Sequence, residues 1–119
     1  MLLFINSCFS IKHFFTLRVL EMGTTLLLKT NYSIDDTKPV VSEAFEKQID
    51  FVHSRFIKFD SECKKFETKY KMKSELFLTR FESGELRDDL QWFDWYAAFR
   101  GRKLWGKKYS VLSEISWSE

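Results

Sequence analysis

Five carboxylates gather in the C-terminal half of the sequence and are the first candidates for chemistry. The group comprises Glu82, Glu85, Asp88, Asp89 and Asp94. Acidic clusters hold Mg²⁺ in nucleases, where the metal ions clamp the reacting phosphate. The same residues also suit a helix end, a turn and a helix start, because caps and the helix dipole favour negative charge there. We therefore expect no metal and no cofactor, and we interpret the group as a docking surface for a basic partner.

A basic group follows the acidic one along the chain. It comprises Arg100, Arg102, Lys103, Lys107 and Lys108. Cations interleaved with an aromatic residue, here Trp105, suit phosphate contacts and base stacking, so nucleic-acid binding is one interpretation. A solvated face near a helix C-terminus explains the same residues, because the helix dipole favours cations there.

Histidines and cysteines are sparse. The sequence has His13, His53, Cys8 and Cys63, and no glycine-rich loop that would cradle a phosphate. His53 lies beside an apolar seam, and no nearby nucleophile gives it a role as general base. The two cysteines match no metal-ligand spacing, so we expect Cys63 to be a buried apolar side chain. The sequence therefore predicts a non-catalytic, cytoplasmic protein.

The composition predicts the kind of scaffold that positions these groups. The 119 residues include 19 Lys and Arg against 17 Asp and Glu, so the chain as a whole is not a basic arm or an acidic tail. It has 13 Phe, 4 Trp and 4 Tyr but only 4 Gly and 1 Pro. This richness in aromatic residues argues against disorder, and the scarcity of turn residues argues against an all-β fold. We expect one all-α domain.

The clearest periodic pattern is an apolar seam spaced alternately by four and three residues. It consists of Phe45, Ile49, Val52, Phe56, Phe59, Cys63, Phe66 and Tyr70. Such a heptad pattern predicts a long helix, from about Pro39 to Lys71, that packs along its length on another helix. Phenylalanines at the seam favour a helical bundle over a two-stranded coiled coil.

The segments after the seam predict a short helical corner and a returning helix. Ser74 is a candidate N-cap for a short helix, and Gly84 is a candidate stop. Asp88 and Asp89 are candidate caps for a third helix that begins at Leu90 and folds back antiparallel along the seam. We expect residues 38–119 to form this helical domain.

The N-terminal part carries weaker signals. Residues 24–30 are a candidate short strand, and residues 22–37 as a whole are expected to be strand and loop. Residues 1–21 are an expected upstream extension before a start at Met22. Polar residues interrupt their apolar stretch, and its charges follow rather than precede it, so we expect neither a signal peptide nor a membrane segment.

Residues 66–98 resemble a family of short prokaryotic proteins with a long charged helix followed by the motif KYGMSSEEFxxRFExGELGDDxDFFEW. The matching anchors are Tyr70, Met72, Ser74, Phe77, Arg80, Phe81, Gly84, Leu86, Asp88, Asp89, Phe93 and Trp95. Two glycines of the motif are replaced here by Lys71 and Arg87, and a side chain at either place strains a turn with positive φ.

Many members of that family are encoded beside a small toxin and are regarded as antitoxins. The resemblance implies a non-catalytic protein that binds and neutralises a small toxin. The aromatic anchors expected to contact the partner are Trp92, Trp95, Tyr96 and Phe99. The carboxylates of Glu85, Asp88 and Asp89 are expected to face the basic site of an RNA-cleaving toxin.

Two alternatives remain open at this point. One is a nucleic-acid-binding transcriptional regulator that uses the basic residues from Arg100 to Lys108. The other is a homodimeric helical-bundle protein in which the phenylalanine seam of one copy packs against that of a second copy.

Overall fold

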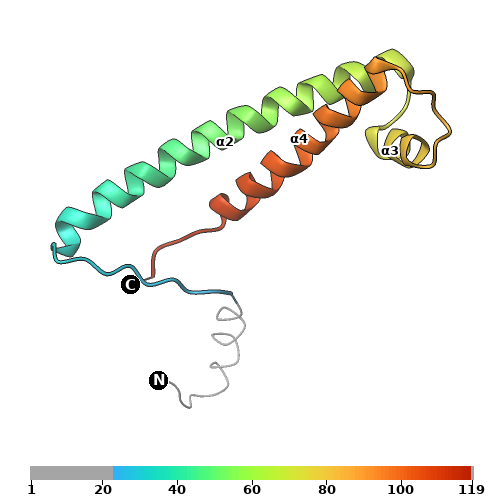
Figure 1. The fold of residues 1–119 in the computed structure, drawn as a ribbon. Helices are drawn as coiled ribbons and strands as arrows, with labels where there is room; N and C mark the ends of the chain where they lie inside the picture. The colour runs from blue at the N-terminus through green and yellow to red at the C-terminus, as the bar shows by residue number, and fades with distance from the viewer. Residues whose placement is uncertain (1–22, 119) are drawn as a thin grey trace, which may run out of the picture. The chain divides into compact units, whose positions relative to one another are not determined.

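The computed structural model describes residues 23–118 and is helical, as Figure 1 shows. Its helices are α2 (Ile34–Tyr70), α3 (Ser74–Glu82) and α4 (Leu90–Ser113). No strand occurs in this described range, which confirms the all-α class. Residues 24–30 have no regular secondary structure, so the short strand predicted there is not found. The predicted extension over residues 1–21 lies outside the described residues.

Helix α2 is longer than the seam alone predicts. It begins at Ile34, five residues before the predicted start, and Pro39 lies inside it. Asp35 and Asp36 stand in its first turn, where negative charge complements the helix dipole. Its 37 residues make a rod of about 55 Å at 1.5 Å per residue.

The corner between α2 and α4 turns at two residues with positive φ. Lys71 has a φ of 51°, directly after the last residue of α2, so a position that is glycine in the resembling family is strained here. Gly84 has a φ of 80° and lies just beyond α3, which confirms it as the stop. Arg87 does not have positive φ, so the strain expected there is absent.

The predicted caps are only partly met. Lys73, rather than Ser74, occupies the N-cap position of α3, and Ser74 is the first helical residue and is buried. Asp89 occupies the N-cap position of α4, but its side chain makes no capping hydrogen bond.

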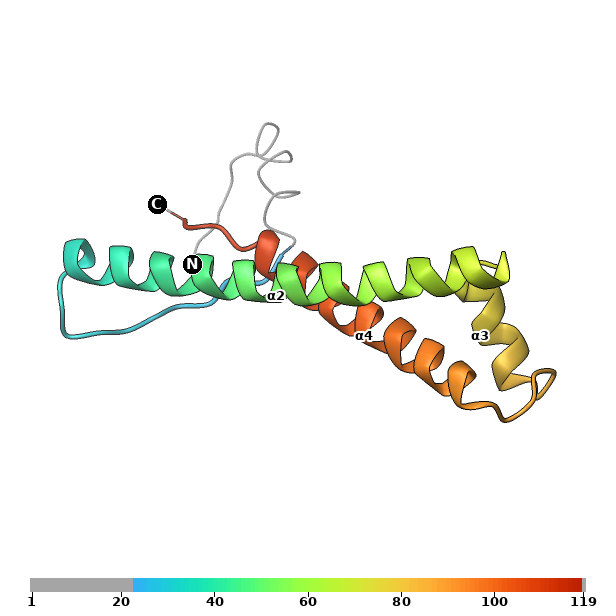
Figure 2. The same cartoon turned by 90° about the horizontal axis from the view of Figure 1, so that it is seen from above.

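Helix α4 runs antiparallel to α2 and crosses it obliquely, as Figure 2 shows. Ring contacts define the direction, because rising positions in one helix meet falling positions in the other. Phe66 stacks on Trp95 with ring centroids 5.5 Å apart. Phe51 meets Trp105 edge-on at 5.8 Å, and Phe45 meets Trp117, beyond the end of α4, at 6.3 Å.

Gly101 and Gly106 let the two helices approach closely. A Cβ on Gly101 would stand 2.5 Å from the ring of Phe59, and one on Gly106 would stand 3.2 Å from the ring of Phe56. Helix α4 continues through both glycines. The two glycines lower the helix propensity of α4, but they make room for the phenylalanines of the seam.

The core is a narrow strip along this interface. Its buried apolar side chains are Val52, Cys63, Phe77, Trp95, Ala98 and Phe99. Every residue of the predicted seam is buried or half-buried, which confirms the seam as the packed face of α2. Most of the seam is half-buried against α4, with Leu78 of α3 packed near Cys63 and Trp117 on Phe45.

Candidate partner-binding site

A stack of aromatic rings fills the corner where the three helices meet. The indole of Trp95 is fully buried and lies parallel to the ring of Phe77, with centroids 4.1 Å apart and an interplanar angle of 6°. Phe66 and Tyr70 of α2 stack on the same indole at 5.5 and 5.6 Å. Trp95 therefore joins one ring from α3 and two from α2.

A hydrogen bond fixes the orientation of this indole. Its N–H donates to the hydroxyl of Ser74 at 2.9 Å, and both side chains are fully buried. A buried donor that loses its acceptor is costly, so this bond sets the position of α3 relative to α4. Ser74, predicted as a cap, serves instead as the acceptor for Trp95.

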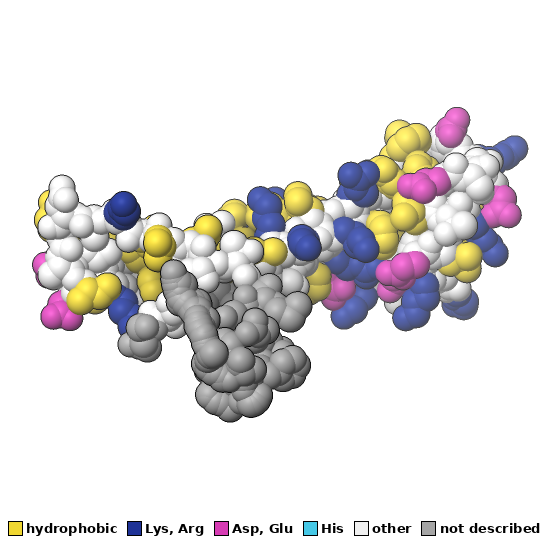
Figure 3. All heavy atoms as spheres, turned by 90° about the horizontal axis from the view of Figure 1, so that it is seen from below, with side chains coloured by type: hydrophobic (Ala, Val, Ile, Leu, Met, Phe, Trp, Pro, Cys, Tyr) yellow, Lys and Arg dark blue, Asp and Glu magenta, His cyan; other side chains and the backbone are white. Residues whose placement is uncertain are grey.

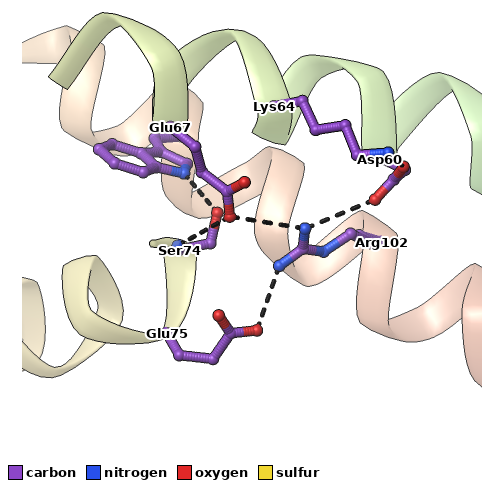
Figure 4. Close-up of polar contacts among 7 residues, drawn as sticks. Asp60, Lys64, Glu67, Ser74, Glu75 and Arg102 are labelled. Atoms are coloured by element: carbon purple, nitrogen blue, oxygen red, sulfur yellow. Dashed lines mark hydrogen bonds and ion pairs between the residues drawn. The ribbon is translucent and has the colours of Figure 1, made fainter. Parts of the chain in front are cut away.

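A charged cluster around Arg102 lies beside the stack, as Figure 4 shows. The guanidinium of Arg102 is 3.5 Å from Asp60, 3.7 Å from Glu67 and 3.3 Å from Glu75. Glu67 also accepts a hydrogen bond from the backbone N–H of Ser74 at 2.9 Å. A single cation of α4 thus binds carboxylates of α2 and α3, and the cluster closes the corner.

The environment sets the protonation of two groups in this region. Burial alone raises the pKa of the Glu67 carboxyl, but hydrogen bonding by Ser74 and the charge of Arg102 outweigh it, so the pKa lies below its ordinary value. Burial raises the pKa of the Cys63 thiol, against an opposing effect of Arg102. The carboxylate is therefore held charged and the thiol neutral, which suits a structural role for both.

The four aromatic residues predicted to contact a partner fall into two pairs. Trp95 and Phe99 are buried, and their rings belong to the core of this chain. Trp92 and Tyr96 are half-buried and leave an edge outside. Trp92 packs on Tyr70 at 4.8 Å, and the hydroxyl of Tyr96 accepts a hydrogen bond from Arg100 at 2.7 Å.

The predicted carboxylates lie on the outside of the corner. Glu85, Asp88 and Asp89 are all exposed, in or next to the loop between α3 and α4. Glu85 is 3.5 Å from the guanidinium of Arg80. No group of three potential ligands in the described part of the chain is arranged to hold a metal ion.

Three exposed apolar side chains at the corner are not among the contact residues predicted from the sequence. Leu76 of α3 and Leu90 and Phe93 of α4 are exposed, and Phe93 packs edge-on against Phe81 at 5.4 Å. The spacing of Leu90 and Phe93, three residues apart on one helix face, was the available signal. We call Leu90, Phe93, the edge of Tyr96 and the three exposed carboxylates the corner surface. Trp92, two residues after Leu90, lies about 160° round α4 from it, on the side that packs on Tyr70.

The structure divides the predicted basic group. Arg102 is occupied by the carboxylates of the cluster, whereas Arg100, Lys103, Lys107 and Lys108 are exposed on α4. Trp105, the expected base-stacking ring, instead packs against Phe51, with the guanidinium of Arg55 5.4 Å from its centroid.

Comparison of the chain with protein families, with characterised proteins and with solved structures finds no match. Within the described residues, no helix is both long enough and apolar enough to cross a membrane. A functional assignment therefore depends on the residues and geometry of this chain.

Proposed function

We propose that this chain is a non-catalytic binding protein of the antitoxin type, which acts in the cytoplasm by docking its corner surface on a small basic toxin. The observation that carries the proposal is the combination of exposed apolar side chains with exposed carboxylates at one corner. Leu90 is 82% exposed and Phe93 49% exposed. Protein interfaces combine such an apolar centre with a polar rim.

The charge of the corner supports a basic partner. Residues 82–89 contain four carboxylates and only one cation, Arg87. An enzyme that cleaves RNA needs a cationic surface for phosphates. Carboxylates on the corner surface would steer such a partner to it and then occupy the RNA site.

The apolar side chains would supply affinity once the partner has docked. Fully burying a Leu or Phe side chain stabilises by about 1.5–3 kcal/mol. Leu90 has most of that gain still available, and Phe93 has about half. Tyr96 would contribute its exposed edge.

Co-expression with the short reading frame adjacent to its gene tests this proposal. The neighbour alone is expected to arrest bacterial growth, and the full chain is expected to restore it. Growth arrest that persists at matched expression of both proteins would contradict the proposal.

A matched pair of charge reversals then locates the surface. The test variant combines Glu85→Lys, Asp88→Lys and Asp89→Lys. The control combines Glu43→Lys, Glu46→Lys and Asp50→Lys, at exposed positions of α2 far along the chain from the corner. We expect the first variant to lose rescue and the control to keep it, while both retain the helical circular dichroism of the parent.

The other two interpretations receive less support from the geometry. The phenylalanine seam packs on α4 of the same chain, so a dimer formed through the seam requires the hairpin to open. Base stacking on Trp105 requires the ring to leave Phe51. Light scattering and salt-dependent filter binding of DNA or RNA test these two alternatives directly.

A further inference from the structure

Helix α4 carries a second apolar stripe that faces away from α2. Leu90, Ala97, Leu104 and Val111 recur every seven residues, and all four are exposed. At 3.6 residues per turn, this stripe lies roughly 150° around α4 from the face that carries Trp95, Ala98 and Arg102. Its spacing is that of one of the two apolar positions of a heptad, and the position three residues further on is filled by Phe93, Arg100 and Lys107.

Cations flank and interrupt this stripe, and Asp94, near the start of α4, is the one acidic residue of the helix. Between Trp95 and Ser113 the sequence has no acidic residue. The charge of Arg102 is balanced by its three carboxylates. Arg100, Lys103, Lys107 and Lys108 are exposed and make no ion pair within the described chain. Figure 3, seen from below, shows basic side chains with apolar and acidic ones among them.

We propose that this outer stripe of α4 is a docking site for an acidic amphipathic helix of another protein. A heptad stripe fits the apolar seam of a second helix, because its knobs recur at the spacing of the holes on that helix. The cations beside it would pair with Asp or Glu at the flanking positions of the partner. The methylene arms of Arg and Lys would cover the rest of the apolar strip.

The charge distribution disfavours a second copy of this chain as the occupant. Two copies joined along this stripe would bring their uncompensated cations together across the seam, and like charges at such short range repel. A lipid surface fits less well than a helix. Helices that lie in a membrane interface bury a broad apolar face, whereas Arg100 and Lys107 stand within this narrow strip.

This inference concerns a surface other than the corner and does not rest on the proposed function. The outer stripe and the corner surface share Leu90. The test therefore uses Leu104, which lies about four turns further along α4. Growth rescue without peptide binding would overturn the present inference alone, and the reverse result would overturn the antitoxin proposal alone.

The probe is a labelled synthetic helix of about three heptads, with Leu at the seam and Glu at the flanking positions. Its like charges keep it from pairing with itself. We titrate it with the full chain and follow fluorescence anisotropy. We expect saturable binding, and binding at least about tenfold weaker for a peptide with Lys in place of every Glu.

Two substitutions at equally exposed leucine and isoleucine positions localise the binding. Leu104 is 52% exposed on α4, and Ile57 is 48% exposed on α2. Leu104→Ser is expected to weaken binding of the acidic peptide at least about tenfold, whereas Ile57→Ser leaves it unchanged. Circular dichroism and thermal melts verify that both variants fold.

Four results would overturn the proposal. They are equal binding of the acidic and basic peptides, no effect of Leu104→Ser, a dimer in sedimentation velocity that Leu104→Ser dissociates, and Leu104-dependent binding to anionic vesicles without binding to the peptide. The third result would assign the stripe to a second copy, and the fourth would assign it to a lipid surface.

Discussion

The close approach of the two long helices at Gly101 can be tested with a single added methyl group. Gly101→Ala raises the helix propensity of α4 by about 1 kcal/mol. The new Cβ would stand 2.5 to 2.7 Å from three atoms of the Phe59 ring, including Cγ near its base. Because Cγ is bonded directly to Cβ, that ring can move aside only if Phe59 changes its χ1 angle or the helices shift apart.

The expected steric cost of the added methyl group exceeds its gain in helix propensity. Overpacking of this kind costs typically 1–3 kcal/mol, so Gly101→Ala should destabilise the fold by about 1 kcal/mol. Gly106→Ala is the matched control, because the added Cβ would be 3.2 Å from the Phe56 ring, a distance that a shift of a few tenths of an ångström relieves. Gly106→Ala should keep most of the gain in helix propensity, so its free energy of unfolding should rise by roughly 0.5 kcal/mol.

Thermal unfolding followed at 222 nm measures the difference. At about 4–8 °C per kcal/mol for a domain of this size, the two variants should differ in Tm by roughly 6–12 °C, with the parent between them. A Phe59→Leu background should remove most of the penalty at Gly101, because the two positions are coupled through one contact. If Gly101→Ala stabilises as much as Gly106→Ala, the packing at Phe59 is not as described.

Three further predictions concern the corner. Lys71→Gly should stabilise the fold by roughly 0.5–1 kcal/mol, because it removes the strain of a side chain at a φ of 51°. Gly84→Ala should destabilise the fold by about 1 kcal/mol, because it places a side chain at a φ of 80°. Thermal melts measure both changes. Ser74→Ala should cost about 1–3 kcal/mol in urea unfolding, because the buried indole N–H of Trp95 loses its acceptor; a change within error would contradict this. Against the effect of burial, hydrogen bonding by Ser74 and the charge of Arg102 hold the pKa of the Glu67 carboxyl below its ordinary value, so this carboxylate stabilises the fold at neutral pH and loses its contribution as the pH falls through the folded-state pKa. Glu67→Gln should therefore destabilise at pH 7 and approach the parent as the solution is acidified, in urea titrations.

The long helix and its packed face could be predicted from the sequence because a seam of eight residues is a local, periodic pattern. The predicted start is five residues too late, because the sequence pattern places Pro39 in the first turn. In the structure Pro39 lies in the second turn, where it cannot donate a backbone hydrogen bond, and Asp35 and Asp36 favour the earlier start through the helix dipole. The stop at Gly84 was also predictable, since few other residues accept its φ at low cost.

The assignment of individual aromatic rings to core or surface could not be predicted in the same way. Residues 92–99 are aromatic or apolar on almost every side, so periodicity alone does not distinguish Trp92 from Trp95. The distinction comes from Ser74 and Phe77, which select the Trp95 ring by a hydrogen bond and a stacked contact. These are long-range contacts, and no local pattern encodes them.

The position of Arg102 decides how the rest of α4 is interpreted. In the sequence it is one of five cations, and all five together suggest a phosphate-binding surface. In the fold its charge is neutralised by Asp60, Glu67 and Glu75, and it belongs to the packed face. The remaining four cations lie along a row of exposed leucine, alanine and valine side chains. This arrangement suits an acidic helix better than it suits a nucleic acid.

A hairpin of two helices has one internal interface, and α2 packs its seam there against α4. Helix α4 has two apolar faces, of which the fold covers one. Covering the second requires a third helix, and the charges along it favour one supplied by another protein. A partner helix on α4 would bury Leu104 and Val111, which are each 52% exposed in the free chain. The free chain should therefore gain thermal stability in proportion to RT ln(1 + [L]/Kd) when the acidic peptide is added, and a Tm that does not rise at saturating peptide would contradict this reasoning.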